Sequence, residues 1–137
     1  MSETEDIFRI LRENWKILVR WILGIHGIPE VTVDELRKRM DSNDPPILID
    51  IRFEDDFYGR GESKYGHIPG AKHIPFLKLE DSLEDLDPNK EIVTMCPGGG
   101  LSLAAVEVLN EAGFKNVKSL KGGTDAWHKK GYPLTIE

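Results

Sequence analysis

The segment around the chain's only cysteine constrains the fold more than any other. Residues 92–95 are apolar, Cys96 follows them, and glycines occupy positions 98–100. From Leu103 onward, apolar residues recur at helical spacing. This order predicts a strand, a tight glycine loop and a helix. Cys96 should therefore lie between the carboxyl end of the strand and the amino end of the helix.

The predicted loop would surround the thiol with backbone donors. The first N–H groups of a helix have no partner within it, and the helix dipole presents its positive end there. Consecutive glycines let the backbone curve around an anion without Cβ clashes. A cysteine in such surroundings reacts as the thiolate. We therefore predict Cys96 as a nucleophile, with a substrate-binding loop made of Pro97, Gly98, Gly99, Gly100, Leu101 and Ser102.

Two other interpretations of this segment stay open. A single cysteine beside a strand is often only a small buried hydrophobic residue. A glycine-rich turn between a strand and a helix can also hold a nucleotide phosphate. However, neither GxGxxG nor GxxxxGK[ST] occurs in the chain. The missing motifs favour the covalent nucleophile over the phosphate site.

Apolar runs and helical patterns alternate along the rest of the chain. Strands are expected at 31–32, 47–51, 71–74, 92–95 and 117–120, and helices at 33–40, 102–112 and 124–130, with shorter helical turns after 53 and 76. Alternating strands and helices predict an α/β fold. The expected architecture is a parallel sheet of about five strands with helices on both faces.

Composition narrows the class of protein. The chain has 137 residues, 39% of them hydrophobic and 31% charged, which is typical of one globular domain. A net charge of -6 without a basic tract argues against nucleic acid as a partner. A single cysteine and an acidic amino terminus, unlike a secretory signal, predict a reducing, cytoplasmic location. The four histidines show no metal-ligand spacing, so no metal site is predicted.

An amphipathic helix is expected ahead of the domain. Apolar residues step by three or four along 5–25, at Ile7, Leu11, Trp15, Leu18, Ile22 and Ile25. Gly24, Gly27 and Pro29 should end it, which divides the chain into a helix with linker, 1–28, and a domain, 29–137. Its longest unbroken apolar runs are far shorter than a membrane span. It could pack on its own domain, join a second copy in a homodimer, or lie on a membrane surface.

Asp50 and Arg52 come at the end of the predicted strand 47–51. Ligands of parallel α/β sheets bind at the carboxyl ends of the strands, where Cys96 is also expected. The two charged residues could support the Cys96 loop or form a structural ion pair. Both interpretations place them at the same edge of the sheet as Cys96.

Four motifs, in the same order, resemble the rhodanese-like family of single-domain thiosulfate sulfurtransferases. They lie at 49–52, 66–75, 96–102 and 112–134. The resemblance implies the parallel α/β fold, and it implies that Cys96 takes a sulfane sulfur from a donor such as thiosulfate. The resulting persulfide would pass its sulfur to cyanide, a thiol or a partner protein. No metal or organic cofactor is implied.

Loop length and loop charge point in different directions. The loop from Cys96 to Leu101 has the length associated with sulfur transfer, whereas related dual-specificity phosphatases have a longer one. Active members often carry a basic residue in this loop, but here there is none. The alternative is therefore a binding or regulatory module of low activity. Arg60 and Lys64, in a long loop before His67, are hypothesised to supply the missing charge; otherwise they are solvated surface residues.

Overall fold

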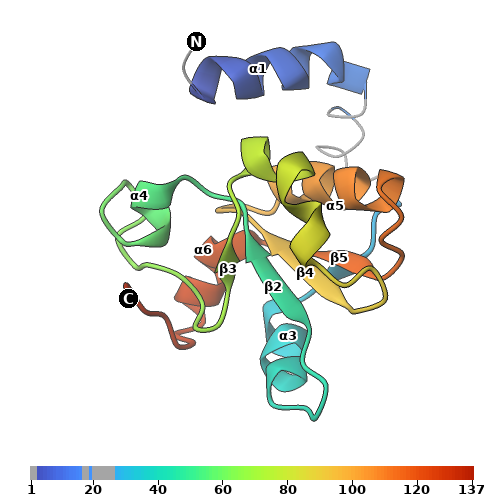
Figure 1. Cartoon of the computed structure of the whole chain (residues 1–137). Coiled ribbons are helices and arrows are strands. Elements are labelled where there is room, and N and C mark those ends of the chain that lie inside the picture. Colours follow the sequence, from blue (N-terminus) through green and yellow to red (C-terminus); the bar gives the residue numbers. More distant parts are fainter. Residues whose placement is uncertain (1–2, 17–18, 20–26) are drawn as a thin grey trace.

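A five-stranded parallel sheet forms the centre of the molecule (Figure 1). The structure is a computed structural model, and it describes residues 3–16, 19 and 27–137. The strands are β1 (Glu30–Val31), β2 (Ile47–Asp50), β3 (Lys72–His73), β4 (Ile92–Met95) and β5 (Val117–Leu120), in the spatial order β1-β5-β4-β2-β3. Every neighbouring pair is parallel. The predicted α/β fold is confirmed.

Helices cover both faces of the sheet. The helices among the described residues are α1 (Glu3–Glu13), α3 (Val33–Met40), α4 (Glu54–Phe57), α5 (Leu101–Glu111) and α6 (Gly123–Lys129), with 3-10 turns at Phe76–Lys78 and Glu80–Asp85. Ile49 and Ile92 pack in one buried cluster with α5, whereas Leu48 and Val93 pack in a second cluster with α3 and α6. Successive strand residues point to opposite faces, so each central strand serves both clusters.

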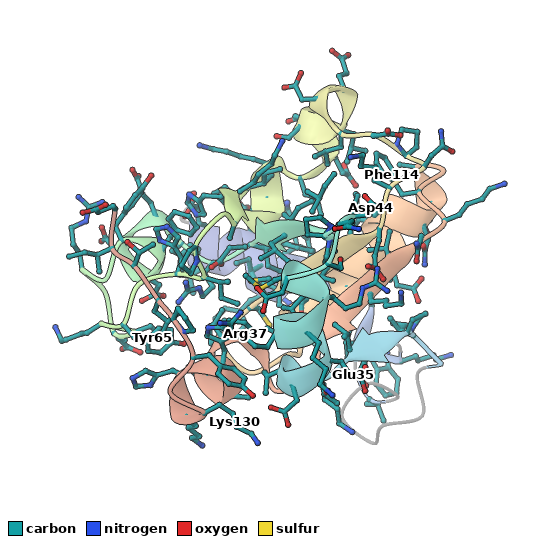
Figure 2. All side chains as sticks on the ribbon, turned by 90° about the horizontal axis from the view of Figure 1, so that it is seen from below. Glu35, Arg37, Asp44, Tyr65, Phe114 and Lys130 are labelled. Carbon is teal, nitrogen blue, oxygen red and sulfur yellow. The ribbon has the colours of Figure 1, made fainter. Side chains whose placement is uncertain are left out.

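Side-chain contacts stabilise the start of α3 and its packing beside α6. Thr32 caps α3, because its Oγ1 accepts a hydrogen bond of 3.1 Å from the Glu35 amide. At the end of α6, Lys130 lies beside α3 (Figure 2), with its Nζ 3.3 Å from a carboxylate oxygen of Asp34. Trp127 of α6 is fully buried beneath this layer.

The helix α1 covers the first part of the helix expected over 5–25, and after a turn at Asn14 the described residues 15, 16 and 19 are again helical. It ends at Glu13, and the side-chain amide of Asn14 donates a 2.7 Å hydrogen bond to the Ile10 carbonyl. Ile10 packs against the α5 cluster, whereas Phe8 and Trp15 are 62% and 58% exposed. Most of the expected helix beyond residue 16 lies outside the described residues. Within the described part of the chain, no helix has the length and apolarity that crossing a membrane requires.

The register of β2 and β4 brings two predicted site segments together. Asp50 is the partner of Met95, and the Ile51 amide donates a 3.0 Å hydrogen bond to the Met95 carbonyl. The two strands therefore end in step. Arg52 and Cys96 leave the sheet at the same edge, as the sequence predicts.

Candidate active site

Cys96 is buried, and its sulfur is held by the loop that follows it. The residue is only 2% exposed. Its Sγ accepts hydrogen bonds from the backbone amides of Gly99, at 3.2 Å, and of Ser102, at 3.4 Å. The Ser102 hydroxyl oxygen also lies 3.4 Å from Sγ. Two backbone N–H dipoles therefore point at one sulfur atom.

Only the middle one of the three loop glycines is sterically required. Gly99 has a φ of +90°, and a Cβ there would lie 3.0 Å from the Gly122 amide nitrogen. A side chain at Gly98 or Gly100 would meet nothing within 4 Å. The positive φ at Gly99 turns its amide toward Cys96, which a residue with a Cβ would resist.

The predicted loop amides do not all contact the sulfur. Pro97 has no amide hydrogen, so the prediction of a Pro97 donor is wrong on chemical grounds. Its carbonyl instead accepts a 3.0 Å hydrogen bond from the Asp125 amide. Among the described residues, the amides of Gly98, Gly100 and Leu101 are not donors to Sγ, and a role for them toward a bound ligand stays a prediction.

The start of α6 fixes the Cys96 loop from the other side. The Thr124 amide donates a 2.9 Å hydrogen bond to the Cys96 carbonyl, next to the bond from Asp125 to Pro97. Gly123 makes this approach possible. Its φ is +65°, and a Cβ there would lie 2.1 Å from the Cys96 carbonyl oxygen. The loop and α6 are thus in backbone-to-backbone contact.

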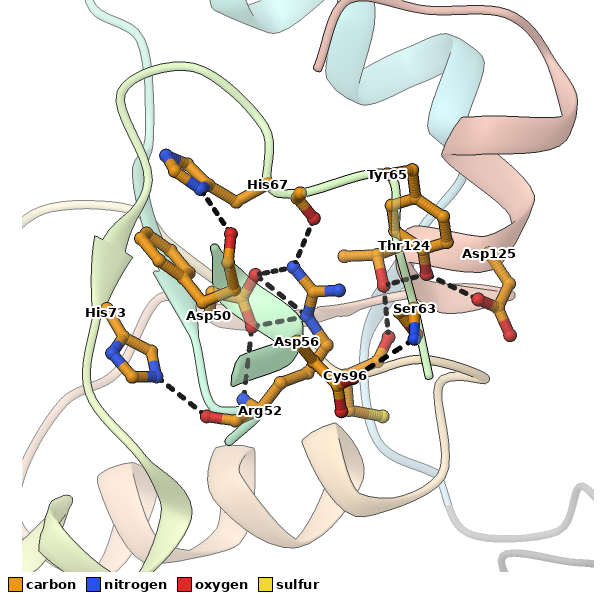
Figure 3. A network of polar contacts seen from close by, with 12 residues as sticks. Asp50, Arg52, Asp56, Ser63, Tyr65, His67, His73, Cys96, Thr124 and Asp125 are labelled. Carbon is orange, nitrogen blue, oxygen red and sulfur yellow. Dashed lines mark hydrogen bonds and ion pairs between the residues drawn. The ribbon is translucent and has the colours of Figure 1, made fainter. Parts of the chain in front are cut away.

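Asp50 and Arg52 form a buried ion pair beside the loop (Figure 3). Both side chains are fully inaccessible, and Arg52 Nη2 lies 2.7 Å from Asp50 Oδ2 and 2.7 Å from the Gly66 carbonyl oxygen. Burial opposes the charge of Arg52, but the hydrogen bond and the charge of Asp50 outweigh it and raise the pKa of Arg52. This geometry matches the structural ion pair that the sequence allowed: Arg52 holds the loop ending at Gly66 onto the sheet.

Tyr65 connects the long loop before His67 to α6, and sequence reasoning missed it. Its hydroxyl lies 2.9 Å from Thr124 Oγ1 and donates to the Asp125 carboxylate. Its ring lies 5.5 Å from the Arg52 guanidinium carbon (Figure 3). Burial and the hydrogen bond to Asp125 raise the pKa of Tyr65. No local signal marks this contact, because Tyr65 and Asp125 are 60 residues apart.

The two candidate cations of this loop lie in different surroundings. Arg60 is directed to the carboxylates of α4, 3.6 Å from Asp55 and 4.0 Å from Glu54, and its side chain is 60% exposed. Lys64 instead lines an open cavity together with Tyr65 and Asp125. The structure does not bring Arg60 and Lys64 together, and a role for either in donor binding stays a prediction.

Metal ligands are not gathered at this edge. The described residues contain no group of three or more histidine, cysteine, aspartate or glutamate side chains placed to hold a metal ion.

Comparisons with known proteins identify relatives of the chain. The chain is 34% identical over 106 residues to "Putative sulfurtransferase YtwF" of Bacillus subtilis, covering 77% of this chain and 96% of that protein. It is 29% identical over 104 residues to the longer "Putative sulfur carrier protein YrkF" of the same organism, covering 76% of this chain and 53% of that protein. The crystal structure of a rhodanese-like domain protein from Staphylococcus aureus superposes with a TM-score of 0.68 at 28% identity, covering 78% and 98% of the two chains.

The family itself follows from the match to a family model. The model of the Rhodanese-like domain matches residues 32–130, which include the strands β2, β3, β4 and β5 and the complete Cys96 loop, while β1 lies just before the matched range. The relatives and the solved structure point to the same fold. The chain belongs to the rhodanese-like domain family.

Proposed function

We propose that the chain is a sulfurtransferase or persulfide carrier in which Cys96 is the nucleophile. The observation that supports this proposal most is that the Gly99 and Ser102 amides donate hydrogen bonds to the sulfur of the only cysteine, at the carboxyl end of β4. The names of relatives, a sulfurtransferase and a sulfur carrier protein, support this proposal. A reducing cytoplasm, which keeps a lone thiol free, is the proposed location.

The proposed reaction consists of two displacements at sulfur. The Cys96 thiolate attacks the outer sulfur of thiosulfate, a new S–S bond forms, and the bond to the sulfonate breaks as sulfite leaves with the electron pair. The terminal sulfur of the persulfide is then attacked by cyanide or by a thiolate. This second step leaves the Cys96 thiolate and a thiocyanate or a new persulfide. Charge and atoms balance without an oxidant.

The loop has a separate task in each step. The Gly99 and Ser102 amides stabilise the anionic Sγ before attack, in a site that excludes most water. After attack, the negative charge resides on the terminal sulfur, toward which the amides of Gly98, Gly100 and Leu101 are proposed to donate. Because none of these groups carries a full charge, we expect weak binding of a dianion such as thiosulfate.

A second candidate is a binding or regulatory module of low turnover. It is favoured by the absence of a basic side chain in the loop from Pro97 to Leu101. The exposed Phe8 of α1 and the exposed Trp15 that follows the helix support a homodimer as its assembly. Light scattering of the full chain tests the dimer, since a monomer mass at high concentration would contradict it.

Intact-mass measurement tests the sulfur-transfer proposal. After incubation with thiosulfate or mercaptopyruvate, the chain should gain one sulfur atom, and subsequent cyanide should remove it. Cys96→Ser should gain none, because the hydroxyl is not ionised at neutral pH. An unmodified mass with both donors would reject the sulfurtransferase and favour the low-turnover module. A sulfur gain in Cys96→Ser would reject Cys96 as the nucleophile.

A further inference from the structure

Three buried hydroxyl groups lie beneath the Cys96 loop. Thr94, Ser102 and Ser119 are each fully inaccessible. The Ser102 hydroxyl lies 3.4 Å from Cys96 Sγ and 2.6 Å from the hydroxyl of Ser119 on β5. Thr94 instead donates a 2.9 Å hydrogen bond to the Ser102 carbonyl. A chain of two hydroxyls therefore leads from the sulfur into the core, and the second of them has no task in the reaction described above.

The number of hydrogen atoms on Ser119, Ser102 and Cys96 determines which group donates in each hydrogen bond between them. Within the part of the chain that the structure describes, the Ser102 hydroxyl is the sole hydrogen-bond partner of the Ser119 hydroxyl. Burying a donor without an acceptor costs free energy, so Ser119 donates to Ser102. The hydrogen of Ser102 is then left to point at Cys96 Sγ.

Every hydroxyl hydrogen of Ser102 and Ser119 has an acceptor when the Cys96 sulfur is ionised. When the sulfur is a neutral thiol, one hydrogen of the three residues has none. With a thiol, three hydrogens compete for two contacts, and one of them stays without an acceptor. With a thiolate, two hydrogens serve two contacts: the Ser102 hydroxyl, 3.4 Å away, would donate to the sulfur, which also accepts from two amides. The hydroxyl pair therefore favours loss of the thiol proton.

We propose that Ser119 is a positioning residue that turns the Ser102 hydroxyl toward Cys96 and so stabilises the thiolate. Ser119 acts through Ser102, because its hydroxyl bonds to Ser102 rather than to the sulfur. The inference deepens the proposed function, since it concerns the ionisation of the same nucleophile. It assigns a role to a side chain that arises from β5, outside the loop that carries the cysteine.

The rate of alkylation by iodoacetamide tests this proposal, because Cys96 is the only thiol. Ser119→Ala should lower the rate at neutral pH about threefold to tenfold, the effect of one neutral hydrogen bond. The alkylation rate of Ser119→Ala should rise at a higher pH than that of the wild type and should reach the same plateau. Ser102→Ala should lower the rate at least as much. The double variant should be no slower than Ser102→Ala, because Ser119 acts only through Ser102.

Thr94→Val is the matched control, since it removes an equally buried hydroxyl that does not touch the sulfur. It should keep the wild-type profile. An unchanged profile in Ser119→Ala, an equal shift in Thr94→Val, or additive losses in the double variant would each overturn the proposal. If Ser119→Ala does not fold, Ser119→Thr retains the hydroxyl and must show the wild-type profile, and a shifted one overturns the proposal.

Alkylation needs no sulfur donor, so the two proposals fail separately. A chain that shows the expected profiles but never gains a sulfur atom contradicts the sulfurtransferase and leaves the role of Ser119 intact. A chain that gains sulfur and has a Ser119→Ala profile identical to the wild type contradicts only the role of Ser119.

Discussion

Replacing Gly123 with alanine should destabilise the chain by about 2–5 kcal/mol and abolish sulfur loading of Cys96. The new Cβ would lie 2.1 Å from the Cys96 carbonyl oxygen and 2.4 Å from that of Pro97, both backbone atoms that cannot rotate away. Relief requires the loop to move off α6, which breaks the hydrogen bonds from Thr124 and Asp125. Each contributes about 0.5–1.5 kcal/mol, and the left-handed φ costs an alanine about 1–2 kcal/mol more.

Urea unfolding and the intact-mass assay measure these two effects together. Gly131→Ala is the matched control, because Gly131 also has a positive φ, +73°, but a Cβ there would meet nothing within 4 Å. We expect Gly131→Ala to lose only the cost of the left-handed φ, about 1–2 kcal/mol, and to load sulfur like the wild type. If Gly123→Ala did both as well, the close contact between α6 and the loop would not exist in solution.

Replacing Asp50 with alanine should destabilise the fold by about 3–5 kcal/mol, because it leaves the charge of Arg52 buried without its partner. Both side chains are fully inaccessible, and Arg52 also donates to the Gly66 carbonyl. The loss should therefore spread to the loop that carries Tyr65. Asp50→Asn keeps the shape and an acceptor oxygen, so its cost should lie between those of alanine and aspartate.

Asp55→Ala provides the comparison for the buried pair. Asp55 also faces an arginine, Arg60 at 3.6 Å, but its side chain is 73% exposed. Exposed pairs contribute about 0–1 kcal/mol, so its urea midpoint should stay close to that of the wild type. Equal destabilisation by Asp50→Ala and Asp55→Ala would show that burial does not determine the contribution of the Asp50–Arg52 pair.

The elements of the fold could be predicted because local pattern and burial agree along the chain. The apolar runs at 47–51 and 92–95 become β2 and β4, and the expected helix 33–40 is α3, begun by the Thr32 cap. The turn at Asn14 could not be predicted from periodicity. The apolar stripe continues past Glu13, and residues 15, 16 and 19 are again helical, but at the turn the Asn14 side chain donates to the Ile10 carbonyl.

The candidate site could be predicted only where sequence neighbours make it. Cys96 and the pair Asp50 and Arg52 follow from strand ends and short-range order. Contacts between distant segments leave no local pattern in the sequence. Examples are the contact of Ser102 with Ser119, 17 residues away, and that of Tyr65 with Asp125. The direction of Arg60 toward α4 likewise depends on a turn that periodicity does not describe.

The central claim, that backbone amides hold the Cys96 sulfur as an anion, is tested most directly by a nuclear magnetic resonance titration. The amide protons of Gly99 and Ser102 should move downfield with rising pH, in step with the Cβ carbon of Cys96, because a hydrogen bond to a charged sulfur is stronger. In Cys96→Ser this movement should be absent. If the Cβ carbon titrates while both amide signals stay in place, the sulfur is not held by this loop.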